Sequence, residues 1–370
     1  MQFTVDQNQL AQALSMVIRL VQQQNTMAVL GGVQLTASDS GLDVQTTDLF
    51  SVMTVKVRAH VIEPGTIVLP AATFNDLIHR LPTATVDVQV DPHSGKAVLK
   101  YGRNRATIHG FGNDQLPEFP TFGEGVVSVT LPAGTLTSFA RQIIFACSKE
   151  ESRPILKGIH IELGSGKVVL VSTDGSRLSH AWAALPDYRG PEMRLVLPAK
   201  ILAEASRLDS SGQPIVVTFR DGFVQFATQD TMLTSRVLDG DYPDYQRVIP
   251  QDYQVQIRVP TADLRGSVER AHLIASKDRS NAVKFNHQIG LLQMTASAAE
   301  VGQAQEILEC DSQGSEMEIM FNSTFIIDAL KSFSGEEVMI EFSGVQSPAR
   351  IRDAANSQYF HILLPLRQLV

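Results

Sequence analysis

The sequence predicts an α+β protein made of three tandem copies of one unit, each running helix, strands, helix, strands. Two observations predict it. The segment VLPAATFNDLIHRL at 68–81 returns as VLPAKILAEASRL at 196–208, and more loosely as MFNSTFIIDALKSF at 320–333. A second family of amphipathic helices recurs at nearly the same spacing. Tandem self-similarity of this kind indicates a repeat architecture, with copies over residues 1–125, 126–253 and 254–370.

The first helix of each copy is predicted from apolar residues that recur at helical spacing. These helices fall within residues 6–21, 131–146 and 259–275. Their predicted buried stripes are Leu10, Leu14, Val17, Ile18 and Val21, then Leu136, Phe139, Ala140, Ile143 and Ile144, then Leu264, Val268, Ala271 and Ala275.

The second helix of each copy follows an extended run that ends in Val-Leu-Pro in the first two copies. Proline suits the start of a helix, where its missing N–H would have no partner anyway. In the third copy Asn322 takes that place, and asparagine is typical of an N-cap. The predicted buried stripes are Phe74, Leu77, Ile78 and Leu81, and then Ile201, Leu202, Ala205 and Leu208.

Strands fill the rest of each copy. Hairpin-like segments punctuated by glycine lie between the two helices, at 31–57, 157–183 and 282–308. An alternating strand follows each second helix, at 85–91, 215–219 and 337–342. Three such units fit either separate beads or a closed, curved assembly in which equal units meet through equivalent surfaces.

The composition is that of a globular protein, with 44% hydrophobic and 19% charged residues. No apolar run approaches the roughly 18 residues of a membrane helix, and the first residues do not resemble a signal peptide, so we expect a cytoplasmic protein. The two cysteines, Cys147 and Cys310, lack the spacing of a disulfide framework or a zinc site. The net charge of −8 disfavours general attraction to nucleic acid.

No catalytic pattern emerges, and we expect no catalytic residue, metal or cofactor. The GSGK at 164–167 lacks the rest of a phosphate loop and reads as a hairpin turn. The STDGSRL at 172–178 could carry chemistry, but a turn cornered on Asp174-Gly175 is favoured, because TTDLF at 46–50 repeats it. An enzyme with a pocket at this turn is one alternative, and a peptide-binding scaffold that never meets DNA is another.

Several segments resemble the bacterial DNA polymerase sliding clamp, the β subunit of the replicative polymerase. They are the TDL and TDGSRL turns, the two VLPA helices, VLDGDYPDYQRVIP at 237–250, FNSTFIIDAL at 321–330 and LLPLR at 363–367. The resemblance spans essentially the whole chain. It implies a head-to-tail homodimeric ring of six similar domains, with helices inside around double-stranded DNA and sheets outside. Such a ring needs only sequence-independent phosphate contacts.

The resemblance also implies the partners. They are replicative and repair DNA polymerases, the clamp loader and other proteins with clamp-binding peptide motifs, all at the nucleoid and none in a membrane. Expected DNA-facing residues are Arg19, Gln24, Arg80, Arg141, Lys149, Arg153, Lys200, Arg207, Lys277 and Arg279, with Lys331 beside them. Gln22, Gln23 and Gln24 stand where the family often has a basic residue.

A partner-peptide pocket is implied between the second and third copies, for peptides of the glutamine-leucine-acidic-leucine-phenylalanine kind. Arg177 and Arg247 are expected to pair with the acidic residue or to donate to peptide carbonyls. Ser176, Leu364 and Pro348 depart from residues common in the family but keep an apolar cleft. The full expected set is Leu156, Thr173, Gly175, Ser176, Arg177, Leu178, Pro243, Arg247, Val248, Pro348, Ile362, Leu363, Leu364, Pro365, Leu366 and Arg367.

A dimer contact is expected at the first helix of the third copy. Leu273 points away from the predicted buried stripe of that helix, as a residue at an interface would. The resemblance places Leu273 and Ile274 against the strand at 101–111 of a second copy. Its expected contributors are Arg103, Arg105, Ala106 and Ile108.

Overall fold

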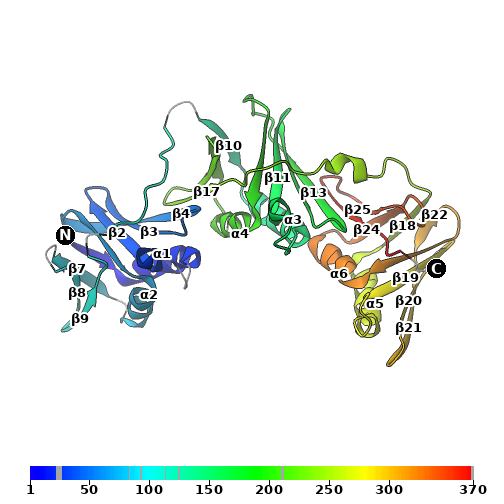
Figure 1. The fold of residues 1–370 in the computed structure, drawn as a ribbon, viewed down its shortest axis with the longest axis horizontal. Helices are drawn as coiled ribbons and strands as arrows, with labels where there is room; N and C mark the ends of the chain where they lie inside the picture. Colours follow the sequence, from blue (N-terminus) through cyan, green and yellow to red (C-terminus); the bar gives the residue numbers. More distant parts are fainter. Residues whose placement is uncertain are drawn as a thin grey trace. The chain divides into compact units, whose positions relative to one another are not determined.

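The computed structural model describes residues 1–21, 27–82, 84–91, 94–112, 114–123, 126–209 and 212–367 (Figure 1). The chain forms two compact units. The first holds Met1–Ala133 and Leu208–Val237, and the second holds Gly134–Arg207 and Leu238–Val370. The second predicted copy is therefore shared between the two units.

The first unit contains a five-stranded sheet, in the order β5-β1-β7-β8-β9, and an eight-stranded sheet, in the order β10-β15-β16-β17-β4-β3-β2-β6. Its elements are β1 Gln2–Asp6, α1 Gln7–Val17, η1 Ile18–Leu20, η2 Ala28–Gly31, β2 Gly32–Ser38, β3 Gly41–Thr47, β4 Ser51–Val57, β5 Ala59–Glu63, β6 Gly65–Pro70, α2 Ala71–Arg80, β7 Thr85–Asp91, β8 Lys96–Tyr101, β9 Asn104–His109, β10 Val127–Leu131, β15 Ile215–Arg220, β16 Phe223–Ala227 and β17 Thr231–Arg236.

The second unit contains a nine-stranded sheet, in the order β14-β11-β12-β13-β26-β25-β24-β18-β22, and a four-stranded sheet, in the order β21-β20-β19-β23. Its elements are α3 Thr135–Ile143, η3 Ile144–Ala146, η4 Pro154–Lys157, β11 Gly158–Gly164, β12 Lys167–Thr173, β13 Arg177–Ala184, β14 Met193–Pro198, α4 Ala199–Leu208, η6 Tyr245–Val248, β18 Val255–Pro260, α5 Thr261–Ala275, β19 Ala282–Gln288, β20 Leu291–Ala298, β21 Gly302–Glu309, β22 Asp311–Gln313, β23 Met317–Asn322, α6 Ser323–Ser332, β24 Glu337–Phe342, β25 Ala349–Asp353 and β26 Tyr359–Leu363.

The helices bury the predicted stripes against these sheets. In the first unit α1 packs on α2, β3 and β4, and in the second unit α5 packs on α6, β20 and β21. The stripes of α4 and α5 are buried as predicted. Those of the other helices are narrower than predicted, because five apolar residues at their edges stay half-exposed: Ile18, Val21, Leu77, Ala140 and Ile144.

Side-chain caps fix the starts of two helices, of which the cap at Asn322 was predicted. Asp6 caps α1, since its carboxylate accepts from the N–H of Gln9 at 3.0 Å. Asn322 caps α6 through Oδ1, which accepts from the N–H of Thr324 at 2.9 Å. The segment at 164–167 closes the β11–β12 hairpin, with Gly164 opposite Lys167, so it is the turn that was predicted.

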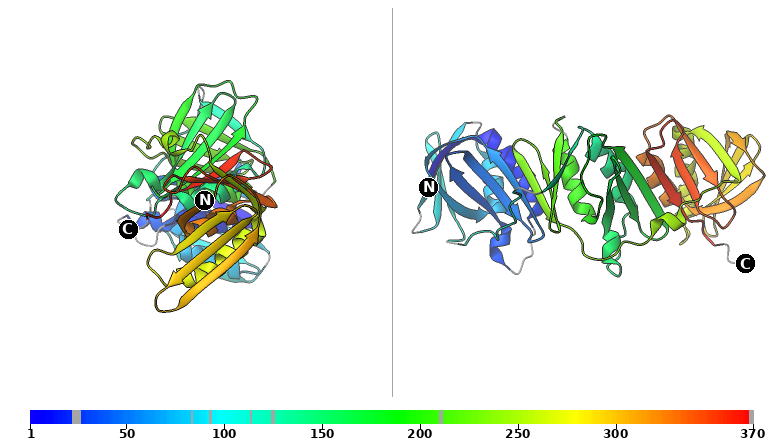
Figure 2. Two further views of the ribbon diagram at one scale, coloured as in Figure 1. Left: turned by 90° about the vertical axis from the view of Figure 1, so that its right-hand side faces the viewer. Right: turned by 90° about the horizontal axis from the view of Figure 1, so that it is seen from above.

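Neighbouring copies join by antiparallel strand pairing within each unit. In the first unit β4 of the first copy pairs with β17 of the second, with Ser51 opposite Ser235. In the second unit β13 of the second copy pairs with β26 of the third, with Arg177 opposite Leu363. This pairing satisfies edge groups that would otherwise stay open. Figure 2 shows the long strands β19–β21 of the second unit side by side, in yellow to orange.

Candidate peptide-binding site

The TDGSR turn between β12 and β13 is held by its own side chains. Thr173 Oγ1 donates to the carbonyl of Arg177 at 2.6 Å and accepts from the N–H of Gly175 at 3.0 Å. Asp174 Oδ1 accepts from the N–H groups of Ser176 and Arg177, at 2.9 and 3.1 Å. Gly175 has φ +94°, a conformation that glycine adopts without strain. The polar groups of this turn therefore fix the backbone, as the turn interpretation predicted.

A cavity of about 190 Å³ opens beside this turn, entirely within the second unit. Its walls come from η4, the β12–β13 turn, the connector that contains η6, and the end of β26. The deepest residues continue into a buried apolar cluster of Val169, Val171, Leu178, Tyr245 and Ile362. The cavity is lined by Arg153, Leu156, Thr173, Gly175, Arg177, Leu178, Pro243, Asp244, Tyr245, Val248, Ile362 and Leu364.

The cavity has buried apolar walls and an open apolar rim. Leu156, Leu178 and Ile362 are buried, whereas Val248 and Leu364 at the rim are 41% and 38% exposed. A concave apolar surface with a few polar groups at its edge is the usual form of a site that takes the side chains of a ligand. This geometry suits apolar peptide side chains better than a reaction.

The structure brings together nine of the residues expected for the peptide pocket: Leu156, Thr173, Gly175, Arg177, Leu178, Pro243, Val248, Ile362 and Leu364. Seven others do not line the cavity: Ser176, Arg247, Pro348, Leu363, Pro365, Leu366 and Arg367. Leu363 is buried on the opposite face of β26 from Ile362, because successive side chains of a strand alternate. The N–H of Leu366 donates to the carbonyl of Met320, which directs the chain end toward β23.

Sequence reasoning missed Asp244 and Tyr245, which lie between the expected Pro243 and Arg247. The 3₁₀ turn Tyr245–Val248 decides which of its side chains face the cavity, and no periodicity in the sequence signals such a short turn. Arg153 was expected to face DNA, but the structure places it among the cavity residues.

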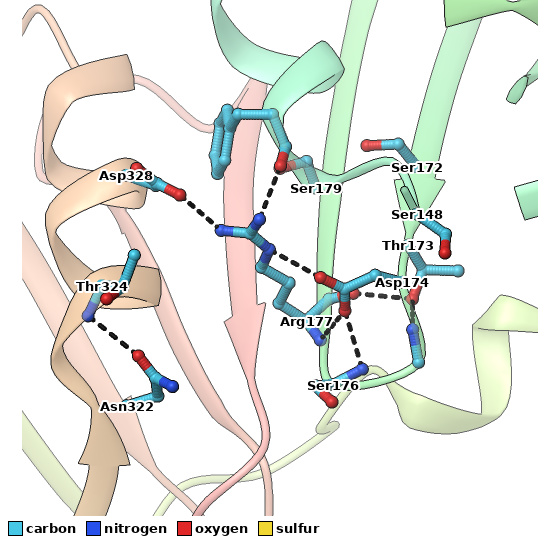
Figure 3. Close-up of polar contacts among 12 residues, drawn as sticks. Ser148, Ser172, Thr173, Asp174, Ser176, Arg177, Ser179, Asn322, Thr324 and Asp328 are labelled. Carbon is cyan, nitrogen blue, oxygen red and sulfur yellow. Dashed lines mark hydrogen bonds and ion pairs between the residues drawn. The ribbon is translucent and has the colours of Figure 1, made fainter. Parts of the chain in front are cut away.

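Arg177 has several partners within the protein itself (Figure 3). Its side chain is only 7% exposed, and its guanidinium donates to Asp174 Oδ2 at 2.9 Å, to Asp328 Oδ2 at 2.8 Å and to the carbonyl of Phe145 at 2.7 Å. It also lies over the ring of Phe325, 4.4 Å from the centroid. The guanidinium thus ties the turn to α6. That Arg177 also pairs with an acidic residue or donates to carbonyls of a bound peptide stays a prediction.

The two arginines at the rim, Arg247 and Arg153, differ in their ion pairs. Arg247 Nε is 2.8 Å from Asp244 Oδ2, in a pair whose side chains are 83% and 54% exposed. Within the described part of the chain, no carboxylate forms an ion pair with the exposed side chain of Arg153. Arg153 is therefore the rim cation that can meet an acidic ligand group.

One buried and one half-buried histidine support the walls in their neutral form. Burial, followed by the nearby Arg177, lowers the pKa of His361 to about 3, and Ser179 Oγ lies 2.8 Å from its Nδ1. Burial likewise lowers the pKa of His180 to about 4, where its ring stacks on Phe360 at 4.5 Å. The site therefore keeps these rings uncharged at neutral pH.

The expected DNA-facing residues lie on or beside helices, and all that the structure describes are exposed. Gln24 and its neighbours Gln22 and Gln23 lie outside the described residues. Arg207 on α4 pairs with Glu204 at 3.5 Å. The others are Arg19 on η1, Arg80 on α2, Arg141 on α3, Lys200 on α4, Lys331 on α6, Lys149 and Arg153 before η4, and Lys277 and Arg279 after α5.

The expected dimer residues divide between an exposed and a buried set. Leu273 on α5 is 66% exposed, and Arg103 and Arg105 beside or on β9 are exposed. Ile274 and Ala106 are half-buried, and Ile108 is buried within its own unit, at 8% exposure. β9 is an edge strand of its sheet, and so is β21. The sequence did not reveal the β21 edge, which carries Ile307 at 57% exposure.

The described residues contain no group of three or more His, Cys, Asp or Glu side chains arranged to hold a metal ion. In the same residues, no helix combines the length and the apolar character of a membrane span.

Three protein-family models match consecutive parts of the chain. They are the N-terminal domain of the DNA polymerase III beta subunit over residues 1–120, its central domain over 130–244 and its C-terminal domain over 246–367. The beta sliding clamp of Bacillus subtilis strain 168 is 29% identical over 378 residues, covering 99% of this chain and 100% of the relative.

Solved structures are similar along the whole chain. The sliding clamp of Bacillus subtilis has a TM-score of 0.95 at 28% identity, covering 100% of this chain and 99% of the other. The DNA polymerase III subunit beta of Pseudomonas aeruginosa has a TM-score of 0.94 at 25% identity, with both chains fully covered. The chain belongs to the bacterial DNA polymerase III beta sliding clamps, non-catalytic processivity factors built from three clamp domains.

Proposed function

We propose that two copies of the chain close head to tail around duplex DNA and tether their clients through the cavity beside the TDGSR turn. Membership of the family implies DNA and a DNA polymerase as partners. The finer proposal adds the clamp loader, repair polymerases and other proteins that carry a short peptide with leucine and phenylalanine anchors. It places the complex on the nucleoid, in the cytoplasm.

The observation that carries the proposal is the cavity, whose apolar walls, with Arg153 exposed at the rim, match such a peptide. Full burial of a leucine or phenylalanine side chain contributes about 1.5–3 kcal/mol. Part of this is offset by the cost of ordering a flexible peptide, so a micromolar dissociation constant is expected. Arg153 can pair with the acidic residue of the peptide, a role also expected of Arg177.

The DNA contact is proposed to be weak and independent of sequence. Exposed Lys and Arg side chains on and beside the helices can meet phosphates, and such contacts weaken as salt rises. The net charge of −8 means that the remaining surface repels DNA. Retention then depends on enclosure rather than on affinity.

The dimer contact is proposed to join the β9 edge of one copy to the β21 edge of the second. Both strands end their sheets in the described order, so each offers backbone groups for pairing. Leu273, exposed on the helix that packs against β21, would be covered at this contact.

A peptide titration tests the cavity. A fluorescent peptide with the sequence glutamine–leucine–aspartate–leucine–phenylalanine should bind the wild-type chain, and Val248→Ser with Leu364→Ser should weaken it at least tenfold. Both residues lie at the exposed rim, so the fold should survive the changes. Ile289→Ser, 80% exposed and away from the cavity lining, is the control and should bind like wild type. Equal affinity in the rim variant would refute the proposal.

A further inference from the structure

The turn between β3 and β4 in the first unit repeats the TDGSR turn bond for bond. Thr47 Oγ1 donates to the carbonyl of Ser51 at 2.7 Å and accepts from the N–H of Leu49 at 3.1 Å. Asp48 Oδ1 accepts from the N–H groups of Phe50 and Ser51, at 3.2 and 2.7 Å. These are the bonds that Thr173 and Asp174 make in the second copy, so both turns have the same rigid frame.

The two turns differ in the two residues at their tips. Where the second copy has Gly175 and Ser176 beside the cavity, the first has Leu49 and Phe50. Leu49 has φ +74°, a left-handed conformation that is an outlier for a bulky residue. Leu49 is 43% exposed and Phe50 is 64% exposed. A strained turn that holds two adjacent apolar side chains in solvent points to a function for them.

Hydrogen bonds fix the tip of this turn, which consists of Leu49 and Phe50. The carbonyl of Phe50 accepts from the N–H of Arg236 at 2.8 Å, which fixes the tip to the end of β17. Ser51 Oγ also donates to the Asp48 carboxylate, at 2.7 Å. A ligand that is already ordered loses little conformational freedom on binding. The tip therefore presents its leucine and phenylalanine in a form prepared for docking.

We infer that the Leu49–Phe50 tip of one molecule docks in the peptide cavity of another copy of the chain. The inference rests on the proposed function of the cavity, which takes leucine and phenylalanine anchors. The chain thus carries both an apolar projection and, on a different surface, an apolar cavity suited to it. Contact between two different surfaces of identical molecules is heterologous, so it forms a ring where the rotation between copies closes and an open chain where it does not. Because each molecule offers both a tip and a cavity, the contact can link dimers into larger assemblies.

The docked tip competes with client peptides, because both occupy the same cavity. Two side chains make a small contact, far below the area of a stable interface, so the association is transient and needs high protein concentration. A client peptide in excess should release it. The tip would thus keep idle cavities covered and yield them to clients.

Sedimentation velocity of the full chain tests the inference over a range of protein concentrations. The weight-average sedimentation coefficient of wild type should rise with concentration beyond the value of the dimer. The double variant Leu49→Gly, Phe50→Ser should lose this rise. It copies the Gly-Ser of the second turn onto the same frame, and its circular dichroism should match wild type. Ile62→Ser, 54% exposed on β5 in the same unit, is the control and should associate like wild type.

Saturating fluorescent client peptide is the second arm and should abolish the rise in wild type. No rise in wild type, a rise that persists in the double variant, or a rise that bound peptide leaves unchanged would each overturn the inference. These outcomes leave the proposed function intact as long as the peptide binds. Failure of the peptide to bind wild type at all would instead remove the proposed function, and the inference with it.

Discussion

At the scale of single residues, Arg177 shows how a side chain can shape a binding cavity while being committed to the protein itself. It lies opposite Leu363 in the β13–β26 pairing and reaches Asp328 on α6, in the third copy. Its partner Asp328 is 151 positions away in sequence, so the ion pair could not be predicted from the local pattern. The TDGSR motif identified the turn, but only the fold reveals what holds the guanidinium.

Arg177→Ala should lower the free energy of unfolding by about 3–5 kcal/mol, because the change leaves Asp174 and Asp328 without their shared cation. Denaturant unfolding measures this. Arg247→Ala is the matched control, since its pair with Asp244 is largely exposed, and it should cost less than about 1 kcal/mol. Similar losses in the two variants would contradict the role assigned to Arg177.

At the scale of elements, the helices and several strands were predictable because their side chains follow the periods of 3.6 and 2. The strands expected at 85–91 and 337–342 are β7 and β24, and the stripe on α5 is buried as predicted. The division of the second copy between two large sheets was not predictable. Strand pairing between copies uses backbone groups, which every residue carries, so no residue pattern signals it.

The residues that line the cavity were also only partly predictable from the sequence. The resemblance supplied most of its lining, whereas the 3₁₀ turn that turns Tyr245 inward and the approach of Arg153 depend on tertiary packing. Because successive side chains of β26 point to opposite faces of the sheet, Ile362 lines the cavity and Leu363 does not. The motifs therefore located the site, and the fold selected its members.

The exposed face of α5 carries the prediction on assembly. Leu273→Ala with Ile274→Ala should convert dimers to monomers, because the double change removes apolar area proposed to be covered by a second copy. Sedimentation equilibrium at low protein concentration measures this. Ile289→Ala, which removes a side chain that is 80% exposed, should remain dimeric. A double variant that sediments as the wild-type dimer would remove these residues from the interface.

At the scale of the whole molecule, the chain combines an acidic net charge with exposed cations on its helices. General attraction to DNA is therefore weak, and the processivity of the family must come from enclosure. Three clamp domains in each chain are joined by strand pairing, and the proposed ring would use equivalent surfaces of a second copy. Enclosure is the claim on which tethering of clients depends.

Retention on DNA of different topology tests this claim most directly. The protein is loaded onto nicked circular DNA by its cognate loader, separated from free protein by gel filtration, and then followed after a restriction enzyme cuts half of the sample. The account predicts that the protein stays on the circles and is lost from the linear molecules by sliding off their ends. Equal retention on circular and linear DNA would contradict it.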